Sequence, residues 1–130
     1  MLTERQRTGE LGERVAAHWL TQRGWTIVDR RFRSGHRDLD LVVSRGDIRS
    51  GGRLVVFVEV RSRRSTLWGT PIETVRLSKQ RQIYQAARAW VHLNGRSGDI
   101  YRFDVLGVRF DESRTFVHHI PNAFWRHGFG

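Results

Sequence analysis

Apolar residues recur at helical spacing in two stretches of the chain. In the first stretch, residues 3–23, they return every three or four positions, which predicts an amphipathic helix that stops at Gly24. Gly9 and Gly12 weaken its first turns and favour a start later than residue 3. The positions expected to face the core are Leu11, Val15, Ala16, Trp19 and Leu20.

A second helix is predicted over residues 78–94. Ser78 offers a hydroxyl as N-cap, and Gly95 is typical of the residue that ends a helix. The apolar face of this helix is expected to consist of Ile83, Ala86, Ala87, Trp90 and Leu93.

Short apolar or alternating stretches between turn signals predict strands. They are expected at residues 25–32, 37–45, 53–62, 99–109 and 115–120. The turn-like stretch 46–52 joins the second strand to the third, and Gly69 with Pro71 is expected to turn the chain toward the second helix. The order α-β-β-β-α-β-β predicts an α/β fold, a mixed β-sheet flanked by helices.

The composition of the chain indicates which class of molecule it binds. The length of 130 residues suits a single domain over 1–130, with its core at about 9–120 and a tail at 121–130 that the pattern does not place. The chain carries 23 Lys+Arg against 13 Asp+Glu, a net charge of +10, and Lys79 is its only lysine. Such a charge favours nucleic acid as a partner, although an arginine-rich composition accounts for part of it. No apolar run reaches the ~18 residues of a membrane span, and the lack of cysteine favours the cytoplasm.

Side chains on a strand point alternately to its two faces, which sorts the acidic residues of the central strands. A charge in an apolar strand is costly to bury unless a partner accompanies it, so the grouping indicates chemistry. The expected groups are Asp38, Asp40 and Val42 on one face of the second strand, Leu39, Leu41 and Val43 on its other face, and Phe57, Glu59 and Arg61 together on the third.

A hairpin symmetric about residues 49 and 50 brings two pairs of charged residues together. Asp38 then lies opposite Arg61, which is an ordinary cross-strand ion pair. Asp40 lies opposite Glu59, which sets like charges about 5 Å apart. Such a pair is destabilising unless a cation or a proton lies between the carboxylates.

Two convergent carboxylates suit a hard divalent cation such as Mg²⁺ or Mn²⁺, which prefers oxygen ligands and keeps several of its waters. A cation bound by Asp40 and Glu59 can hold a phosphate and activate a water for in-line attack on phosphorus. The alternative is that the charged residues of the hairpin are all solvated on an open face of the sheet, as charge clusters usually are.

Asp40, followed by Glu59-x-Arg61 at the end of an apolar strand, resembles the PD-(D/E)xK nuclease signature. Over about residues 9–124 the chain is also similar to the YraN-like family of uncharacterised bacterial proteins. The stretches that carry this resemblance are GELGERVA (9–16), DLDLV (38–42), FVEVRSR (57–63), WGTP (68–71), SKQR (78–81), RFDV (102–105) and HIPNAF (119–124).

The resemblance implies a restriction-endonuclease-like core related to archaeal Holliday-junction resolvases, and it leaves a homodimer open. It also implies a site in which Glu13, Asp40 and Glu59 surround a divalent metal. Two positions depart from the pattern, because Asp38 stands where the family typically has Glu and Arg61 stands where the nuclease motif has Lys. Arginine stays protonated at any working pH, so Arg61 can clamp a phosphate but cannot act as a general base.

Lys79 matches the family pattern and opens the second helix. It is either a stand-in for the missing catalytic lysine or a point charge that binds a phosphate. Gln80 and Tyr84 share a helix face, where they either reach the substrate or form ordinary helix surface. The residues expected to grip phosphates around the carboxylates are Arg61, Arg63, Arg64, Arg76, Lys79, Gln80 and Arg81.

These features together favour a metal-dependent nuclease, or nuclease-like protein, that hydrolyses phosphodiester bonds in DNA in a structure-selective or nonspecific way. Asp40 and Glu59 would bind Mg²⁺ or Mn²⁺. Glu13 would assist through the metal or its water, and Arg61 would hold the phosphate. Two alternatives stay open: a nucleic-acid-binding module on the same fold that does not cut, and an assembly or interaction protein that needs no nucleic acid.

Overall fold

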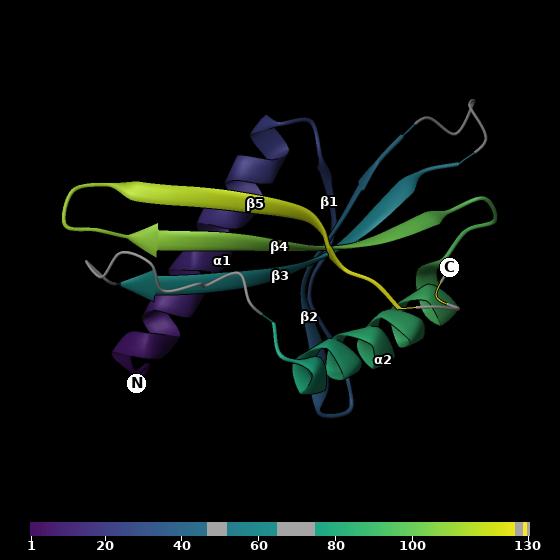
Figure 1. The fold of residues 1–130 in the computed structure, drawn as a ribbon, viewed down its shortest axis with the longest axis horizontal. Helices are drawn as coiled ribbons and strands as arrows, with labels where there is room; N and C mark the ends of the chain where they lie inside the picture. The colour runs from purple at the N-terminus through teal and green to yellow at the C-terminus, as the bar shows by residue number, and fades with distance from the viewer. Residues whose placement is uncertain (47–51, 65–74, 127–128, 130) are drawn as a thin grey trace.

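The computed structural model describes residues 1–46, 52–64, 75–126 and 129 (Figure 1). Its helices and strands follow one another in the predicted order α-β-β-β-α-β-β, which confirms the fold class. The elements are α1 (Glu4–Gln22), β1 (Thr26–Ser34), β2 (Arg37–Arg45), β3 (Leu54–Arg64), α2 (Leu77–Asn94), β4 (Ile100–Phe110) and β5 (Thr115–Phe124).

The strands form one mixed sheet in the order β1-β2-β3-β4-β5. Neighbouring strands are antiparallel except β3 and β4, which are parallel and have α2 between them in the chain. Because a crossover helix between parallel strands runs opposite to both of them, α2 begins near the end of the sheet where β3 finishes. Of the elements described, no helix has the length and apolar character needed to cross a membrane.

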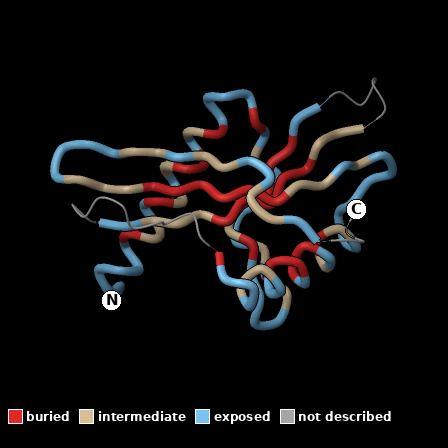
Figure 2. The backbone as a smooth tube through the Cα atoms, in the orientation of Figure 1, coloured by how far each residue is buried: buried red, intermediate tan, exposed pale blue. Residues whose placement is uncertain are grey.

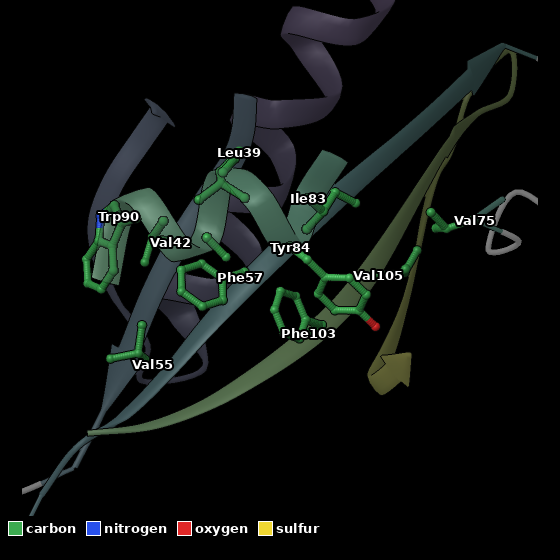
Figure 3. Packing of buried hydrophobic residues seen from close by; sticks show 12 residues of the cluster. Leu39, Val42, Val55, Phe57, Val75, Ile83, Tyr84, Trp90, Phe103 and Val105 are labelled. Carbon is green, nitrogen blue, oxygen red and sulfur yellow. The ribbon is translucent and has the colours of Figure 1, made fainter. Parts of the chain in front are cut away.

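Each face of the sheet carries one helix over its own hydrophobic core. Under α2, Phe57 and Phe103 of the sheet pack with Tyr84, and the fully buried Trp90 meets Phe57 edge to face with ring centroids 5.7 Å apart (Figure 3). α1 packs small and apolar side chains against the opposite face. The buried residues accordingly run through the central strands (Figure 2).

A capping box starts α1 at Glu4, one residue inside the expected range 3–23, so Gly9 and Gly12 do not prevent the first turns from forming. Gln6 N donates to Thr3 Oγ1 at 3.1 Å, and Thr3 N donates to Gln6 Oε1 at 2.9 Å. These two bonds satisfy backbone groups that the first turn leaves unpaired, which offsets the low helix propensity of the glycines that follow.

Small residues on α1 let the helix lie close to β3. A side chain at Gly12 would overlap with Ser62 on β3, so glycine is required there. The buried line of α1 therefore runs through these small residues, and Leu11, which was expected to face the core, is 39% exposed. The buried positions of the helix are Thr8, Gly12, Ala16, Ala17 and Leu20.

Two expectations for α2 are also wrong. The N-cap residue is Arg76, whose side chain makes no capping hydrogen bond, so Ser78 lies inside the first turn. Leu93 is 70% exposed because it lies in the last turn, beyond Trp90, the last buried residue of the helix. The expected core residues that are buried are Ile83, Ala86, Ala87 and Trp90.

The C-terminal part of the chain continues the sheet further than expected. β5 extends to Phe124, so residues 121–124 belong to this edge strand. The expected turn at Gly69 and Pro71 lies outside the described residues, as does most of the expected turn over 46–52.

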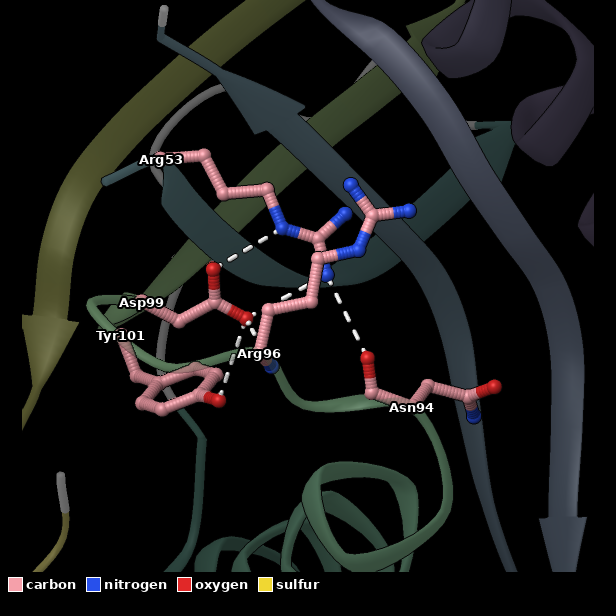
Figure 4. A network of polar contacts seen from close by, with 5 residues as sticks. All are labelled: Arg53, Asn94, Arg96, Asp99 and Tyr101. Carbon is pink, nitrogen blue, oxygen red and sulfur yellow. Dashed lines mark hydrogen bonds and ion pairs between the residues drawn. The ribbon is translucent and has the colours of Figure 1, made fainter. Parts of the chain in front are cut away.

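A polar network fixes the connection from α2 to β4 (Figure 4). Arg53 Nε donates to Asp99 Oδ1 at 2.9 Å, and Arg53 Nη2 donates to Asp99 Oδ2 at 3.2 Å and to the carbonyl oxygen of Asn94 at 3.4 Å. The backbone N–H of Arg96 and the hydroxyl of Tyr101 also donate to Asp99. Burial would raise the pKa of Asp99, but these donors outweigh it and the pKa is lowered. The start of β3 is thereby tied to the end of α2.

A second network surrounds Asp104, a fully buried residue of β4 to which the sequence analysis gave no role. Arg102 Nε and Nη2 donate to the two carboxylate oxygens at 2.7 and 2.8 Å. His119 Nε2 lies 2.7 Å from Oδ2, and Asn122 N donates to Oδ1 at 2.9 Å. Burial would raise the pKa of Asp104, but the bonds from His119, Arg102 and Asn122 lower it. This carboxylate has its acceptors filled and joins β4 to β5.

Asp104→Asn should lower the free energy of unfolding by about 3 kcal/mol at pH 7, because it removes one partner of a buried charged pair. The folded-state pKa of Asp104 is lowered, so its stabilisation is present above the unfolded-state pKa and is lost as the pH falls through the folded-state pKa. Denaturant unfolding curves of parent and variant should therefore converge in acid. Glu112→Gln, at an exposed position on the same hairpin, should change little, and equal losses in both variants would contradict the role of Asp104.

Gly9→Ala and Gly12→Ala should change stability in opposite directions. No atom lies within 4 Å of a Cβ at Gly9, so alanine there should gain about 1 kcal/mol of helix propensity. A Cβ at Gly12 would push α1 away from Ser62, at a cost of about 1–3 kcal/mol. Thermal melts resolve both, since each kcal/mol shifts the melting temperature by roughly 3–5 °C in a domain of this size. Two upward shifts would argue against the close contact between α1 and β3.

Candidate functional site

A cleft of about 1380 Å³ opens at the end of the sheet where β3 finishes. The N-terminal half of α1, the last residues of β3, the first turn of α2 and one residue of β2 line it. Four carboxylates and six cationic side chains face one another across this space. The charged residues of the lining are Glu4, Arg5, Glu13, Asp40, Glu59, Arg61, Arg63, Arg64, Arg76 and Lys79.

The hairpin of β2 and β3 has the register expected from the sequence. Leu41 pairs with Val58, and the same spacing sets position 40 opposite position 59. The expected alternation of faces fails at one residue of β2, because Leu39 packs in the core under α2. The ladder with β3 ends at Leu41, so residues before it are no longer held to the pleat of β3.

Asp40 lies where the backbone ladder is interrupted on both sides. Toward β1, the ladder passes over Arg31, whose φ of 49° lies in the left-handed region. Toward β3, the ladder stops at Leu41, and Asp40 Oδ2 accepts a hydrogen bond from Val60 N at 2.8 Å. The carboxylate thus takes the place of a backbone acceptor, which fixes its position at the end of the sheet.

Asp40 and Glu59 form a pair of like charges. Burial raises the pKa of Asp40 well above its ordinary range, and the charge of Glu59 raises it further. Burial also raises the pKa of Glu59, which is 8% exposed, while Lys79 and Arg61 oppose this. Both shifts have the same sign, so the protein environment disfavours two ionised carboxylates at these positions. A proton or a cation between the two groups would relieve this repulsion.

Two cationic side chains lie beside Glu59. Arg61 Nε is 3.7 Å from Glu59 Oε1, and Lys79 Nζ is 4.0 Å from the same oxygen. Arg61 Nε is buried and has no hydrogen-bond partner within the described part of the chain. The expected ion pair between Asp38 and Arg61 is not formed: Arg61 lies beside Glu59, and Asp38 is exposed beyond the end of the β2–β3 ladder at Leu41.

Glu13 reaches the cleft from α1, but its carboxylate is already paired. Glu13 Oε2 accepts a hydrogen bond from Arg31 Nε at 2.8 Å, and Arg31 Nη2 lies 3.7 Å from Glu10 Oε1. The charge of Glu13 still adds to the raised pKa of Asp40. Within residues 1–46, 52–64, 75–126 and 129, no three His, Asp or Glu side chains form a group that could hold a metal. Of the three carboxylates that the resemblance implies as metal ligands, Asp40 and Glu59 therefore lie together, whereas Glu13 is held apart by Arg31.

Some of the predicted phosphate-gripping residues line the cleft. Arg63, Arg76 and Lys79 do so, and Arg64 joins them while donating from Nε to Thr8 Oγ1 at 3.1 Å. That bond crosses from β3 to α1, so Arg64 also braces the helix against the sheet.

The other predicted residues lie elsewhere. Gln80 and Arg81 are not among the described lining residues, and Gln80 Nε2 donates to the carbonyl oxygen of Val75 at 2.8 Å. Tyr84 is buried in the core under α2, which excludes the interpretation that Gln80 and Tyr84 together reach a ligand. Gln80 stabilises the start of α2.

Sequence reasoning missed Arg31 and Arg5. Arg31 has a detectable signal, because β1 and β2 pair Arg30 with Leu41, and continuing this register places Arg31 next to Asp40. Arg5 lies in the first turn of α1, which the capping box starts, and its side chain lines the cleft. Helix periodicity does not predict which residues of a first turn line a cleft.

Comparison with known proteins places the chain in a family. The model of a family described as "Uncharacterised protein family UPF0102" matches residues 12–108, from α1 to β4. The chain belongs to this family. The match spans Glu13, Asp40, Glu59 and Lys79, so these four residues of the cleft lie within the region shared with UPF0102, whereas Arg5 precedes it.

Relatives named "UPF0102 protein" cover nearly the whole chain. The protein from Myxococcus xanthus is 38% identical over 121 residues, which is 93% of this chain and 91% of the relative. The protein from Anaeromyxobacter dehalogenans is 42% identical over 120 residues, 92% of this chain and 85% of the relative. The protein from Trichlorobacter lovleyi is 41% identical over 120 residues, 92% and 91% of the two chains. These names state no activity, so the argument for a function depends on the site itself.

Asp40→Asn should stabilise the protein at neutral and alkaline pH. A carboxyl whose folded-state pKa is raised binds more protons in the folded than in the unfolded state, so stability falls as the pH rises between the two pKa values. Asparagine keeps an oxygen for Val60 N and removes this loss. Melting temperatures measured from pH 4 to 9 should therefore diverge with rising pH, by roughly 3–5 °C for each kcal/mol regained.

Glu112→Gln provides the control for this pH series, because Glu112 is exposed between β4 and β5, whereas the charge of Asp38 acts on Glu59. Its profile should follow that of the parent closely. Parallel profiles for the parent and Asp40→Asn would contradict the strained pair.

Proposed function

We propose that this protein is a metal-dependent nuclease that hydrolyses phosphodiester bonds in DNA, with a restriction-endonuclease-like core. The observation that carries the proposal is the juxtaposition of the half-buried Asp40 and the buried Glu59, which lie opposite each other on β2 and β3 inside a cleft rimmed by guanidinium groups. A structural role alone would favour neutral or oppositely charged side chains at these two positions, as at Asp104 with Arg102.

Asp40 and Glu59 fit a divalent cation such as Mg²⁺ or Mn²⁺. One oxygen of Asp40 is held by Val60 N, which orients the carboxylate and leaves its other oxygen for a ligand. Mg²⁺ needs only one or two protein carboxylates and keeps several waters, so the pair is sufficient for binding. When bound, the cation supplies a Lewis acid for the phosphate and lowers the pKa of a water molecule.

Arg61 and Lys79 supply positive charge for the substrate phosphate. Arg61 has a buried Nε with no partner in the described residues, and a phosphate oxygen can satisfy this donor. Because arginine cannot release its proton, Arg61 acts as an electrostatic clamp on the scissile phosphate. Lys79, 4.0 Å from Glu59, adds a point charge on the other side of the same carboxylate.

The rim favours recognition of the nucleic-acid backbone over recognition of base sequence. Arg5, Arg63, Arg64 and Arg76 all line the cleft, and arginine contacts to phosphates fix the register of a duplex without reading bases. The net charge of +10 adds long-range attraction for a polyanion. The proposed substrate is therefore DNA selected by shape, or DNA cut without sequence preference.

A second candidate function is a nucleic-acid-binding module that does not cut. Arg61 favours it, because this residue stands where the nuclease motif has a lysine that can lose its proton. In this case the carboxylate pair would hold a cation that bridges to a backbone phosphate, and no reaction would follow.

Cleavage of branched, flapped and linear duplex DNA in Mg²⁺ or Mn²⁺ tests both functions. The parent should cut at least one of these substrates, and Asp40→Asn and Glu59→Gln should each lose at least about a hundredfold in rate, since even groups that only orient metal ligands contribute 10–100-fold. Glu112→Gln should keep full activity, because its side chain is exposed and distant in sequence from the cleft residues.

The other outcomes separate the alternatives. DNA binding without cleavage by the parent, with cleavage gained in Arg61→Lys, would establish the non-cutting module. Binding should weaken with salt by a log–log slope of about −0.9 for each phosphate contacted. DNA binding that is absent even at low salt would overturn both functions and leave the interaction protein.

A further inference from the structure

Arg31 connects the edge strand β1 to the acidic side of α1. Its Nε donates to Glu13 Oε2 at 2.8 Å, and its Nη2 lies 3.7 Å from Glu10 Oε1. The side chain of Arg31 is 57% exposed, whereas that of Glu13 is 24% exposed. The guanidinium is therefore accessible from solvent while it covers part of the Glu13 carboxylate.

The backbone brings Arg31 close to the carboxylate pair as well. The β1–β2 register places Arg31 opposite Asp40, yet its φ of 49° breaks the ladder at that point. A left-handed conformation is unfavourable for a residue with a Cβ, by roughly 1 kcal/mol or more. The guanidinium contacts Glu13 on α1, and no ion pair with the neighbouring Asp40 is found in the described part of the chain.

We propose that Arg31 is an exchangeable counter-ion of Glu13, which restrains Glu13 until a phosphate of the nucleic acid takes the guanidinium. Glu13 is then free to add its charge to the cation site formed by Asp40 and Glu59. Arg31 is in this account a positioning residue that links phosphate binding to metal binding. This inference rests on the proposed function.

Exchanging the Arg31–Glu13 ion pair for an Arg31–phosphate contact is favourable, because the second contact is the stronger of the two. An exposed ion pair is worth about 0–1 kcal/mol, because solvent screens it and two flexible side chains are immobilised. A guanidinium binds a phosphate through two parallel hydrogen bonds, which are shorter and stronger than those of a single contact. Only one nitrogen of Arg31 makes a short contact with Glu13, so the second donor edge is weakly used.

Releasing Glu13 from Arg31 would change the charge at the proposed metal site. Glu13 lines the same cleft as Asp40 and Glu59, and its charge already acts on Asp40. With Arg31 in place, the guanidinium 2.8 Å from Glu13 Oε2 offsets part of that charge. Linkage requires reciprocity, so if phosphate binding at Arg31 favours the metal, metal binding must favour phosphate by the same factor.

The metal side is tested by titrating the full chain with Mn²⁺ in the absence of DNA, by calorimetry. Arg31→Ala should bind Mn²⁺ about fivefold more tightly than the parent, the equivalent of an exposed ion pair. Arg30→Ala removes the same charge one residue away, where the side chain has no described contact with Glu13, and should change the affinity much less. In a Glu13→Gln background the effect of Arg31→Ala should disappear.

The phosphate side is tested by binding a short duplex to the full chain in EDTA, where no metal contributes. Glu13→Gln releases Arg31 and should tighten duplex binding about fivefold. In an Arg31→Ala background the same change should have no effect, and Arg31→Ala should reduce the salt slope by about 0.9, the loss of one phosphate contact.

Alanine at position 31 also removes a brace between β1 and α1, so folding is verified by circular dichroism. Arg31→Gly serves as the second variant, because glycine suits a φ of 49° and offsets the lost contact. If Mn²⁺ binds in an Asp40-dependent way but Arg31→Ala and Arg31→Gly match Arg30→Ala, Arg31 is a structural brace and the exchange is refuted while the proposed function stands. If neither the parent nor these variants bind Mn²⁺, the proposed metal site itself is wrong.

Discussion

The repulsion between Asp40 and Glu59 is the constraint that organises this end of the molecule. The two residues meet because the register of the β2–β3 hairpin pairs Leu41 with Val58, which sets position 40 opposite position 59. Among the described residues, the N–H of Val60 and the charge of Lys79 offset the strain at Asp40, and Lys79 with Arg61 does so at Glu59. Asp104 shows the alternative in the same sheet: three residues donate to it, and its pKa is lowered where that of Asp40 is raised. The sheet therefore contains a fully buried aspartate whose donors outweigh its burial and a half-buried aspartate whose donors do not.

The topology explains why charges of both signs reach the same cleft. Because β3 and β4 are parallel, the crossover helix α2 runs back from the end of β3, and its first turn places Lys79 near Glu59. On the other face, Gly12 allows α1 to approach Ser62 closely, which carries Glu13 and Arg5 to the rim. The positive ends of two helix dipoles thus lie at one cleft, where they favour anionic groups.

The sequence predicted what depends on local periodicity and on a single symmetric hairpin. The order of elements and the pairing of positions 40 and 59 follow from patterns within one or two neighbouring segments. The wrong expectations at the ends of α2 are local, whereas those nearer the site concern contacts between distant segments: the close approach of α1 to Ser62 accompanies the exposure of Leu11, and the partner of Glu13 is Arg31 on a different element. The Asp38–Arg61 pair failed for a related reason, because a ladder that ends at Leu41 cannot hold Asp38 in register. Hydrophobic patterns carry no information on where a ladder stops.

The charges around the carboxylate pair also bear on the choice between a base and a clamp at position 61. Asp40 and Glu59 are matched in number by Arg61 and Lys79, and Glu13 is matched by Arg31. With both carboxyl groups ionised, this arrangement is close to neutral, so a divalent cation bound under the proposed function would give it a net positive charge that a phosphodiester and the additional negative charge of its transition state would balance. A lysine at position 61 that lost its proton would remove one positive charge from this group of side chains when negative charge develops on the phosphate. Arginine cannot do so, and among the described residues its buried Nε has no hydrogen-bond partner. Under the proposed function a substrate phosphate would satisfy this donor while a cation would relieve the Asp40–Glu59 pair, which makes the arginine a coherent part of the site in its own right.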